Sequence, residues 1–172
     1  MSIIYNQTKH VFSIHTANST YQMKVSEYGH LLHLYYGKKI SDEDVSYLIP
    51  HVVRSHESNP AEVGEDRVYS LCAYPQEFSS NDAGDYRIPS IEIVNADGSY
   101  AFVGKYHSHK IYHGKYRLSS LPTLYAAEKE NVETLEIILK DEITHISVKL
   151  LYGVFYDKDV ITRTTVFYND SD

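Results

Sequence analysis

The chain has 172 residues, 42% of them hydrophobic, and this length favours one domain with a single substantial core. With 16 Lys and Arg against 23 Asp and Glu, its formal net charge of -7 argues against a nucleic-acid partner, because phosphate binding requires clustered basic residues. A single cysteine, Cys72, excludes an intramolecular disulfide and a cysteine-based zinc site; the sequence has neither a signal peptide nor an apolar run of about 20 residues, which predicts a cytoplasmic protein with no membrane partner.

Alternating apolar and polar residues predict strands in the first third of the chain. Residues 11–14 and 21–25 follow the two-residue period of a pleated strand, whereas residues 31–36 are apolar on both faces and are expected to form a central strand. Residues 41–50 have the best helical signal, because Ser41 and Asp44 form a capping pattern and Pro50 closes the segment. We expect one or two helical turns there.

The second third is rich in residues that favour turns. Residues 50–66 mix Pro, Gly, Asn and charges without periodicity and are predicted to form a long exposed loop, which at this length is often functional or disordered. Asn-Ala-Asp-Gly at 95–98 lies between two apolar segments rich in strand-forming residues. This arrangement predicts a hairpin with a strand on each side.

Three long strands are predicted toward the C-terminus. They cover residues 133–141, 145–156 and 160–168, and a tight turn at 157–159 joins the last two. Many strands, closely spaced turns and very little helix predict an all-β protein with an antiparallel sandwich or barrel. We expect residues 1–172 to form one such domain.

Three histidines in the segment YHSHKIYHGK are a candidate metal site. His107, His109 and His113 have the same parity in one predicted strand, so they could point one way and bind zinc with an open position for water. Alternatively they lie on an exposed face beside Lys105 and Lys110, since no fourth ligand or orienting carboxylate is close in the sequence. We favour the exposed face and expect no metal and no cofactor.

Acidic residues in the segment PQEFSSNDAGDYR are a second candidate site. Glu77, Asp82 and Asp85 could supply the two carboxylates of a glycosidase, although sequence spacing does not give the distance between them. Alternatively the segment is a turn in which Asp85 pairs with Arg87 or anchors the loop. We favour the second interpretation.

Aromatic residues and the single cysteine also have two interpretations. Seven tyrosines could stack on sugars, but most are expected in the core or on a sheet surface with the hydroxyl in water: Tyr35, Tyr36, Tyr69, Tyr74, Tyr86, Tyr106 and Tyr112. Cys72 has no catalytic Cys/His context and is expected to be a small buried apolar residue.

Eight segments in a fixed order resemble one family of proteins. They are YQMKVSEYGHLLHLYYGKKI, DRVYSL, PQEF with GDYRIPSIEI, NADGS, YHSHKIYHGK, LSSLPTLY, ETLEIILKD and LLYGVFYDKDVITR. In this order, from residue 3 to residue 170, the chain resembles the N-terminal domain of bacterial α-galactosidases, or melibiases, of glycoside hydrolase family 36. No single segment is diagnostic, but together they are specific.

The resemblance implies a fold and a role. The domain is expected to be an antiparallel β-supersandwich of the galactose mutarotase-like type, followed in the whole enzyme by a catalytic (β/α)8 barrel. The family removes terminal α-linked galactose from melibiose and raffinose with retention, in carbohydrate catabolism, and both catalytic Asp residues belong to the barrel. Residues 1–172 are therefore expected to be inactive alone, with three kinds of partner: their own barrel, other copies in a homotetramer, and α-galactoside sugars.

The resemblance also implies which loops approach the substrate. Many family members place loops of this domain near the active site of a neighbouring subunit. The matching positions here are Val53, Arg54, Asp66, Arg67, Asp85, Tyr86 and Arg87. Val53 stands where the family commonly has an Asp that contacts galactose, and Cys72 replaces another common acid, so both departures concern the substrate-facing loops.

Two other functions remain open from the sequence. The sandwich itself could be a free-standing carbohydrate-binding module that recognises galactosides through exposed tyrosines, and it would then bind melibiose or raffinose on its own. A small zinc enzyme that uses His107, His109 and His113 would contain stoichiometric zinc. The ordered set of family segments favours the α-galactosidase domain.

Overall fold

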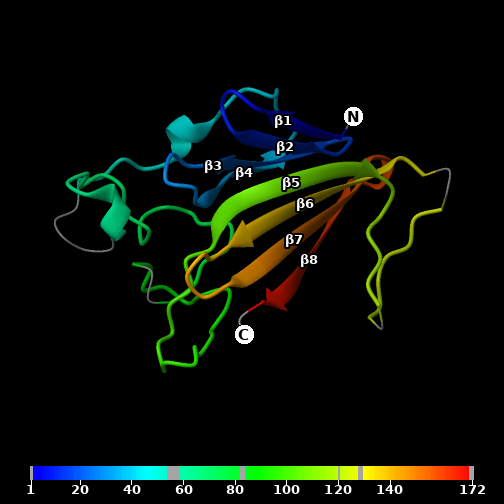
Figure 1. Cartoon of the computed structure of the whole chain (residues 1–172). Coiled ribbons are helices and arrows are strands. Elements are labelled where there is room, and N and C mark those ends of the chain that lie inside the picture. The colour runs from blue at the N-terminus through cyan, green and yellow to red at the C-terminus, as the bar shows by residue number, and fades with distance from the viewer. Residues whose placement is uncertain (1, 54–58, 82–83, 120, 128–129, 171–172) are drawn as a thin grey trace.

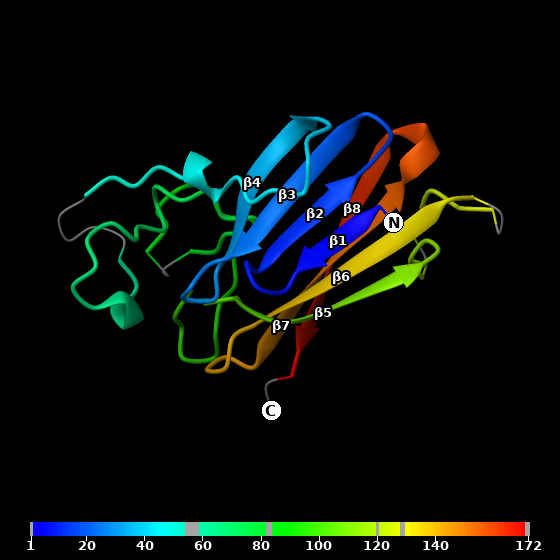
Figure 2. The same cartoon turned by 90° about the horizontal axis from the view of Figure 1, so that it is seen from above.

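The computed structural model describes residues 2–53, 59–81, 84–119, 121–127 and 130–170, and it shows two antiparallel four-stranded sheets (Figures 1 and 2). The first sheet has the order β1-β2-β3-β4 and the second β5-β6-β7-β8. The strands are β1 (Ile3–Asn6), β2 (Val11–His15), β3 (Ser19–Val25), β4 (Leu31–Lys38), β5 (Lys105–His113), β6 (Val132–Lys140), β7 (Ile146–Phe155) and β8 (Val160–Asn169). The predicted all-β sandwich is confirmed.

Helical structure in the described ranges is limited to three short 3-10 turns. They are η1 (Ser46–Leu48), η2 (Ala61–Val63) and η3 (Tyr156–Lys158). Within the same ranges, no helix has the length and apolar character needed to cross a membrane. The expectation of very little helix is confirmed.

The main core lies between the two sheets. Because side chains alternate across a strand, β2 and β3 place Phe12, Ile14 and Met23 on the face that meets Leu135 and Ile137 of β6. All five side chains are fully buried, and each contributes roughly 2 kcal/mol through removal of apolar surface from water. The alternation that predicted these strands therefore also determines which residues form the core.

β4 lies at the end of the first sheet, so the prediction of a central strand is wrong. Leu31 belongs to the main core, whereas Leu32 and Leu34 belong to a second apolar cluster on the other face. Tyr69 and Leu71, from the long connection between β4 and β5, cover that face. The strand is apolar on both faces because a loop, rather than another sheet, supplies the second cover.

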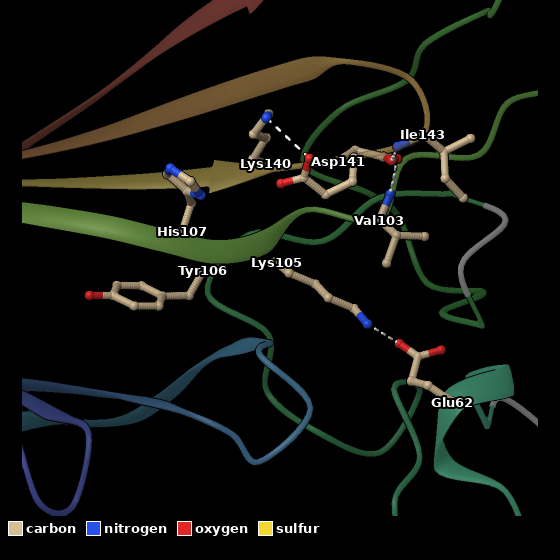
Figure 3. A pocket seen from close by; sticks show the side chains of 9 residues that line it. Glu62, Val103, Lys105, Tyr106, His107, Lys140, Asp141 and Ile143 are labelled. Atoms are coloured by element: carbon tan, nitrogen blue, oxygen red, sulfur yellow. Dashed lines mark hydrogen bonds and ion pairs between the residues drawn. The ribbon is translucent and has the colours of Figure 1, made fainter.

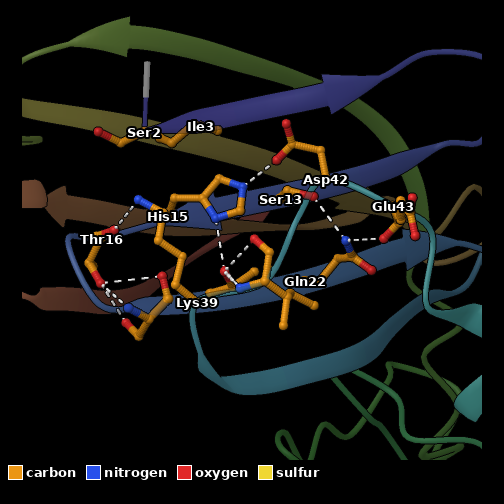
Figure 4. A network of polar contacts seen from close by, with 12 residues as sticks. Ser2, Ile3, Ser13, His15, Thr16, Gln22, Lys39, Asp42 and Glu43 are labelled. Atoms are coloured by element: carbon orange, nitrogen blue, oxygen red, sulfur yellow. Dashed lines mark hydrogen bonds and ion pairs between the residues drawn. The ribbon is translucent and has the colours of Figure 1, made fainter.

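Residues 39–45, which we call the strap, cross the outer face of the first sheet without regular secondary structure (Figure 4). Polar side chains of β2 and β3 hold the strap: His15 contacts Asp42, Thr20 accepts from Ile40 N, Gln22 bonds to the backbone of Glu43 and Val45, and Lys24 pairs with Asp44. Ser13, His15, Thr20 and Gln22 are buried beneath it. Over β2 and β3, the outer face of this sheet is therefore both polar and covered, whereas over β4 it is apolar.

Of the one or two helical turns predicted within residues 41–50, one is present, the 3-10 turn η1. It begins at Ser46 rather than after Ser41, and it has no side-chain cap. Asp44, expected to favour a helix start, instead pairs with Lys24 Nζ at 2.8 Å and accepts from Ser46 N at 2.9 Å. Side chains of the underlying sheet bond to the backbone and the acids of the strap, and these bonds take the place of helix hydrogen bonds before Ser46.

The turn at 95–98 is confirmed, but the regular strands expected on both sides are not. Asn95 N donates to Ser99 O at 2.8 Å, and Gly98 has a φ of 82°, a conformation that favours glycine. Before the turn there is only an isolated bridge at Ile91, and after it Val103 N donates to the Asp141 carboxylate at 2.7 Å. Bonds to other segments replace the ladder that a hairpin would have.

The three C-terminal strands and their connection agree with the sequence analysis. β6, β7 and β8 pair in continuous antiparallel register, from Val132 opposite Phe155 to Ile146 opposite Asn169. The tight turn between β7 and β8 contains η3 and ends at Asp159, which has a left-handed φ of 57°. These strands form most of the second sheet. The connection between β4 and β5 contains the predicted loop at residues 50–66, in whose described part η2 is the regular element, and it places the candidate loops at one end of the sandwich (Figure 1).

Candidate functional site

Asp85 and Arg87 form the centre of a clip that holds two loop segments together. Arg87 Nε donates to Asp85 Oδ1 at 2.8 Å and Arg87 Nη2 to Oδ2 at 2.6 Å, a two-pronged ion pair. The same guanidinium donates to the carbonyl oxygens of Leu71 and Tyr74, at 2.9 and 2.7 Å, while Gln76 Nε2 donates to Asp85 at 2.8 Å. The predicted ion pair is present and anchors residues 84–87 to residues 71–76.

Electrostatics keep both members of the clip charged. Burial of Asp85 tends to raise the pKa of its carboxyl, but hydrogen bonds from Arg87 and Gln76 outweigh burial and hold that pKa below its usual value. The pKa of Arg87 is raised by its bond to Asp85. A carboxylate with both oxygens occupied in this way is a structural anchor and is poorly placed to act as an acid or base.

Cys72 also belongs to the clip. Its Sγ accepts from Tyr86 N at 3.2 Å and lies 3.4 Å from Gly84 O. The residue is half-buried rather than fully buried, and it bonds to the backbone on both sides of Asp85, so the expectation of a small buried apolar residue is corrected. The thiol therefore takes part in holding residues 84–86 against residue 72.

The clip presents two large side chains to solvent. Tyr86 is 78% exposed and Ile88 is 95% exposed. Because Asp85 ties residues 84–87 to residues 71–76, the backbone that carries these two side chains has a defined position. Both side chains are therefore accessible to another domain or subunit.

The other substrate-loop candidates lie in the preceding connection. Val53 is 72% exposed, and Arg54 lies outside the described residues. Asp66 Oδ1 accepts from Val68 N at 2.8 Å and so caps a local turn, while Arg67 is exposed. Val53, Arg67 and Tyr86 are therefore accessible to a ligand. The carboxylates of Asp66 and Asp85 instead form hydrogen bonds inside their own loops.

Glu77 lies inside the sandwich and joins both sheets. Tyr21 Oη and Tyr152 Oη donate to its two carboxylate oxygens at 2.6 and 2.7 Å, and Arg163 Nη2 lies 3.1 Å from Oε1. His33 Nδ1 lies 3.6 Å from Oε2. These partners come from β3, β7, β8 and β4, so sequence analysis could not bring them together.

Strong bonding keeps Glu77 ionised. Burial raises the pKa of its carboxyl, but His33, Arg163 and the two tyrosine hydroxyls stabilise the charged form more, so the pKa is lowered. Burial, followed by the charge of Glu77, raises the pKa of Tyr152. Since its side chain is 1% exposed and fully bonded, Glu77 cannot reach a sugar; Asp82, the third acid considered, lies outside the described residues.

The three histidines do not converge, so the idea that they share one face is wrong. A β-bulge between Tyr106 and Ser108 skips His107, which is exposed on the side of β5 opposite Tyr106 (Figure 3). His109 instead packs edge-on against Phe12, with ring centroids 4.9 Å apart. His113 is exposed at the end of β5. Within the described ranges, no three His, Cys, Asp or Glu side chains are arranged to hold a metal ion.

The cavity beside His107 is lined by ion pairs and apolar stems. It has a volume of about 290 Å³, with Glu62 paired to Lys105 on one side and Lys140 paired to Glu142 on the other (Figure 3). Asp141 is buried in its wall and accepts backbone N–H groups, including that of Ile143 at 2.8 Å. Each carboxylate has a partner, so the cavity holds no free acid pair for glycoside hydrolysis.

The tyrosines divide between core and surface. Tyr69 and Tyr74 are buried and meet edge to face with ring centroids 4.8 Å apart. Tyr35, Tyr106 and Tyr112 are half-buried. Of the seven considered, Tyr36 and Tyr86 are exposed, at 64% and 78%, and are the ones whose rings are open to a ligand.

Comparison with known proteins identifies the family. The profile described as the glycosyl hydrolase family 36 N-terminal domain matches residues 29–172. The chain belongs to this family. It is 46% identical over 98% of its length to the bifunctional alpha-galactosidase/sucrose kinase AgaSK of Mediterraneibacter gnavus, and 33% identical over 98% to alpha-galactosidase AgaA of Geobacillus stearothermophilus. The chain spans 18% and 23% of those two proteins, respectively.

Solved structures of the family have the same fold. The galactosidase domain of AgaSK matches with a TM-score of 0.92 over 97% of this chain and 23% of that chain, at 46% identity. AgaB of Geobacillus stearothermophilus matches with a TM-score of 0.90 over 99% of this chain and 23% of that chain, at 33% identity. A variant of AgaA, which matches with a TM-score of 0.86 at 33% identity over 94% of this chain and 22% of that chain, is in complex with raffinose. The family 36 N-terminal β-sandwich is thus confirmed for this chain.

Proposed function

We propose that the chain is the non-catalytic N-terminal domain of a cytoplasmic α-galactosidase that hydrolyses terminal α-galactosides, such as melibiose and raffinose, in carbohydrate catabolism. The observation that carries this proposal is the match of nearly the whole chain to α-galactosidases of which it spans only about a fifth. In this account the catalytic barrel and its two carboxylates lie in the rest of the enzyme. The complex of the related AgaA with raffinose supports the substrate class.

The chemistry of the candidate site supports a non-catalytic role. Retaining glycosidases need two carboxyl groups about 5 Å apart on either side of the scissile bond. Glu77 is buried between the sheets, and both oxygens of Asp85 are bonded to Arg87 and Gln76. In the described residues these acids stabilise the fold and leave hydrolysis to another domain.

The exposed loop residues support a role in assembly and in shaping the active site of a neighbouring subunit. Large apolar side chains are exposed in the connection between β4 and β5: Tyr47, Leu48, Val52, Val53, Tyr86 and Ile88. Exposed apolar residues gathered on loops are typical of protein contact surfaces. In the proposed homotetramer these loops contact a barrel domain, and Tyr86 and Arg87 approach the sugar.

Val53 makes this subunit's contribution to sugar binding weaker than the family pattern implies. Valine cannot accept a hydrogen bond from a sugar hydroxyl, and its side chain is 72% exposed. We expect a Val53→Asp change in the full-length enzyme to lower KM for melibiose, with little change in kcat. An unchanged KM would show that the position does not face the sugar.

Hydrolysis of an aryl α-galactoside tests the proposal. The full-length gene product is expected to turn the substrate over, whereas purified residues 1–172, folded as judged by circular dichroism, are expected to show none. Turnover that co-purifies with the 172-residue chain and survives repeated chromatography would contradict a non-catalytic role.

A free-standing carbohydrate-binding module is the second candidate, because Tyr36 and Tyr86 are exposed. Sugar rings stack on such side chains, so the isolated chain would bind melibiose or raffinose in a titration. Loss of that binding in Tyr36→Ala or Tyr86→Ala would favour the module. No saturable binding by the isolated chain favours the enzyme domain.

A further inference from the structure

A groove lies between two turns at one end of the sandwich. One wall comes from residues between 94 and 103, which contain the turn at 95–98, and the other from residues between 141 and 146, which contain the turn from β6 to β7. The groove has a volume of about 620 Å³, and Asn169, the last residue of β8, also lines it. Figures 1 and 2 both show the two turns and the end marked C at the same end of the molecule. The groove shares no lining residue with the Asp85 clip.

Asp141 holds the two walls of the groove together. Its carboxylate accepts Val103 N at 2.7 Å from one wall and Ile143 N at 2.8 Å from the other, and the residue is only 4% exposed. The second acid of the lining, Asp97, accepts Ser99 N at 2.9 Å within its own turn. The groove is therefore preformed, and its buried acid is already occupied by backbone N–H groups.

The groove presents apolar side chains to solvent from both walls. Val94 is 70% exposed on one wall, and Ile143 is 87% exposed on the other. The other apolar residues of the lining are Ala96, Ala101, Val103 and Ile146. Because these side chains line one hollow, they form a contiguous apolar surface, which, unlike a single exposed side chain, indicates a docking site.

The last described residue of the chain is fixed beside this groove. Asp170 N donates to His145 O at 3.2 Å, and His145 belongs to the turn between β6 and β7. Under the proposed function, residues 1–172 are followed by the rest of an α-galactosidase, because the matched profile is an N-terminal domain and the chain spans only about a fifth of its relatives. The polypeptide that follows residue 172 therefore starts within a few residues of the groove.

We propose that the groove is the docking site for the segment of the same polypeptide that directly follows residue 172, an inference that rests on the proposed function. A segment attached beside the groove has a high effective concentration there, whereas a second subunit loses translational and rotational freedom when it binds. Covering Val94 and Ile143 removes apolar surface from water. The segment accordingly places apolar, uncharged side chains in the groove.

Site-specific photo-cross-linking in the full-length enzyme tests this proposal. The photoreactive residue p-benzoylphenylalanine replaces Val94, and isotope-labelled subunits are assembled with unlabelled ones, so that a link within one chain differs in mass from a link between two chains. We expect a link within one chain to a peptide in the first ten residues or so after residue 172, a stretch of at most about 35 Å. A link between subunits, a link only to a distant part of the chain, or no link overturns the proposal.

The outcome is separable from that of the proposed function. A full-length enzyme that hydrolyses an aryl α-galactoside but gives no such link overturns the docking site alone. A native product that ends at residue 172 overturns both, and its mass shows this directly.

A pair of variants shows whether the apolar lining holds the segment. Ile143→Asp changes a side chain that is 87% exposed in this domain, so the sandwich should stay folded. The change is expected to lower the yield of the link from position 94 at least about tenfold, because a charge is costly in an apolar contact. Leu121→Asp, at a side chain that is 59% exposed in the connection between β5 and β6, is the matched control and should leave the yield unchanged. Equal yields from the two variants overturn the role of the groove.

Discussion

Glu77 shows at the scale of one residue how a polar side chain can join two sheets. Its carboxylate lies between Tyr21 of the first sheet and Tyr152 and Arg163 of the second. Removing one member of a buried charge pair is more costly than the pair is favourable, because the remaining charge stays desolvated. The position therefore matters for stability although it takes no part in catalysis.

Glu77→Gln is expected to lower the free energy of unfolding by about 3 kcal/mol, because Arg163 loses its counter-ion and the tyrosine hydroxyls meet an amide. Glu142→Gln serves as the control: this residue is exposed and pairs with Lys140 at the surface, so its loss should cost less than about 0.5 kcal/mol. Urea unfolding followed by tyrosine fluorescence measures both. Equal, small effects of the two changes would mean that the network contributes little.

His30 gives the chain a pH-dependent stability. It is buried, its Nδ1 bonds to Tyr69 Oη at 2.7 Å, and Nε2 has no partner in the described chain. Burial, followed by the charge of Lys105, lowers the pKa of His30 to about 4. As the pH falls below the unfolded value of about 6.5, the unfolded chain binds a proton that the folded chain excludes, so stability is lost.

The expected loss from this histidine between about pH 6.5 and about pH 4 is roughly 3 kcal/mol. His30→Gln should therefore flatten the pH dependence of the unfolding free energy in that window. His107→Gln, at an exposed position, should leave it unchanged. Identical slopes in the wild type and the His30 variant would show that this histidine titrates in the folded protein as it does in the unfolded chain.

At the scale of elements, the sequence predicts several strands and tight turns, but it does not predict the course of the long connection between β4 and β5. The two-residue alternation of β2, β3 and β6 indicates which face of each strand meets the core. This pattern can be read from a few neighbouring residues in the sequence. Gln22 and Lys24 hold the strap on the sheet, and these contacts link residues about 20 positions apart in the sequence. A local pattern does not contain that information. A capping pattern such as Ser41 with Asp44 therefore cannot show that bonds to the sheet will replace helix hydrogen bonds in this segment.

Gln22→Leu is expected to loosen the strap. The change removes the bonds to Glu43 O at 2.9 Å and from Val45 N at 3.2 Å, each worth about 1 kcal/mol, and leaves both backbone groups without a protein partner. Amide hydrogen exchange of residues 40–46 should become faster, with little change in β6 and β7. Gln7→Leu, in the exposed turn after β1, is the control and should change neither region.

At the scale of the whole molecule, sequence analysis succeeded with the class of fold and the family, and it failed where distant elements meet. The all-β prediction came from periodicity, and the ordered segments gave the resemblance that the family 36 profile confirms. The Asp85 to Arg87 pair was predictable because the two residues are close in sequence. The Glu77 network was not, because its members come from different strands.

The exposed loops of the connection between β4 and β5 are expected to form contacts between subunits of the full-length enzyme. Ile88→Asp in the full-length protein places a charge on a side chain that is 95% exposed in this domain, so it should not unfold the sandwich. If Ile88 is covered in the proposed homotetramer, the charge should shift the protein to smaller species in sedimentation velocity. Leu121→Asp, in the connection at the opposite end of the sandwich, is the control and should leave the assembly intact.

The central claim, that these residues are one domain of a larger α-galactosidase, is tested most directly by the mass of the native gene product in its own host. An antibody to this domain would detect the product, and peptide mass spectrometry would confirm its sequence. The account predicts a protein several-fold heavier than the 19.8 kDa of this chain, with peptides from a downstream catalytic barrel. A native product of 19.8 kDa would contradict it and make sugar binding by the sandwich the leading function.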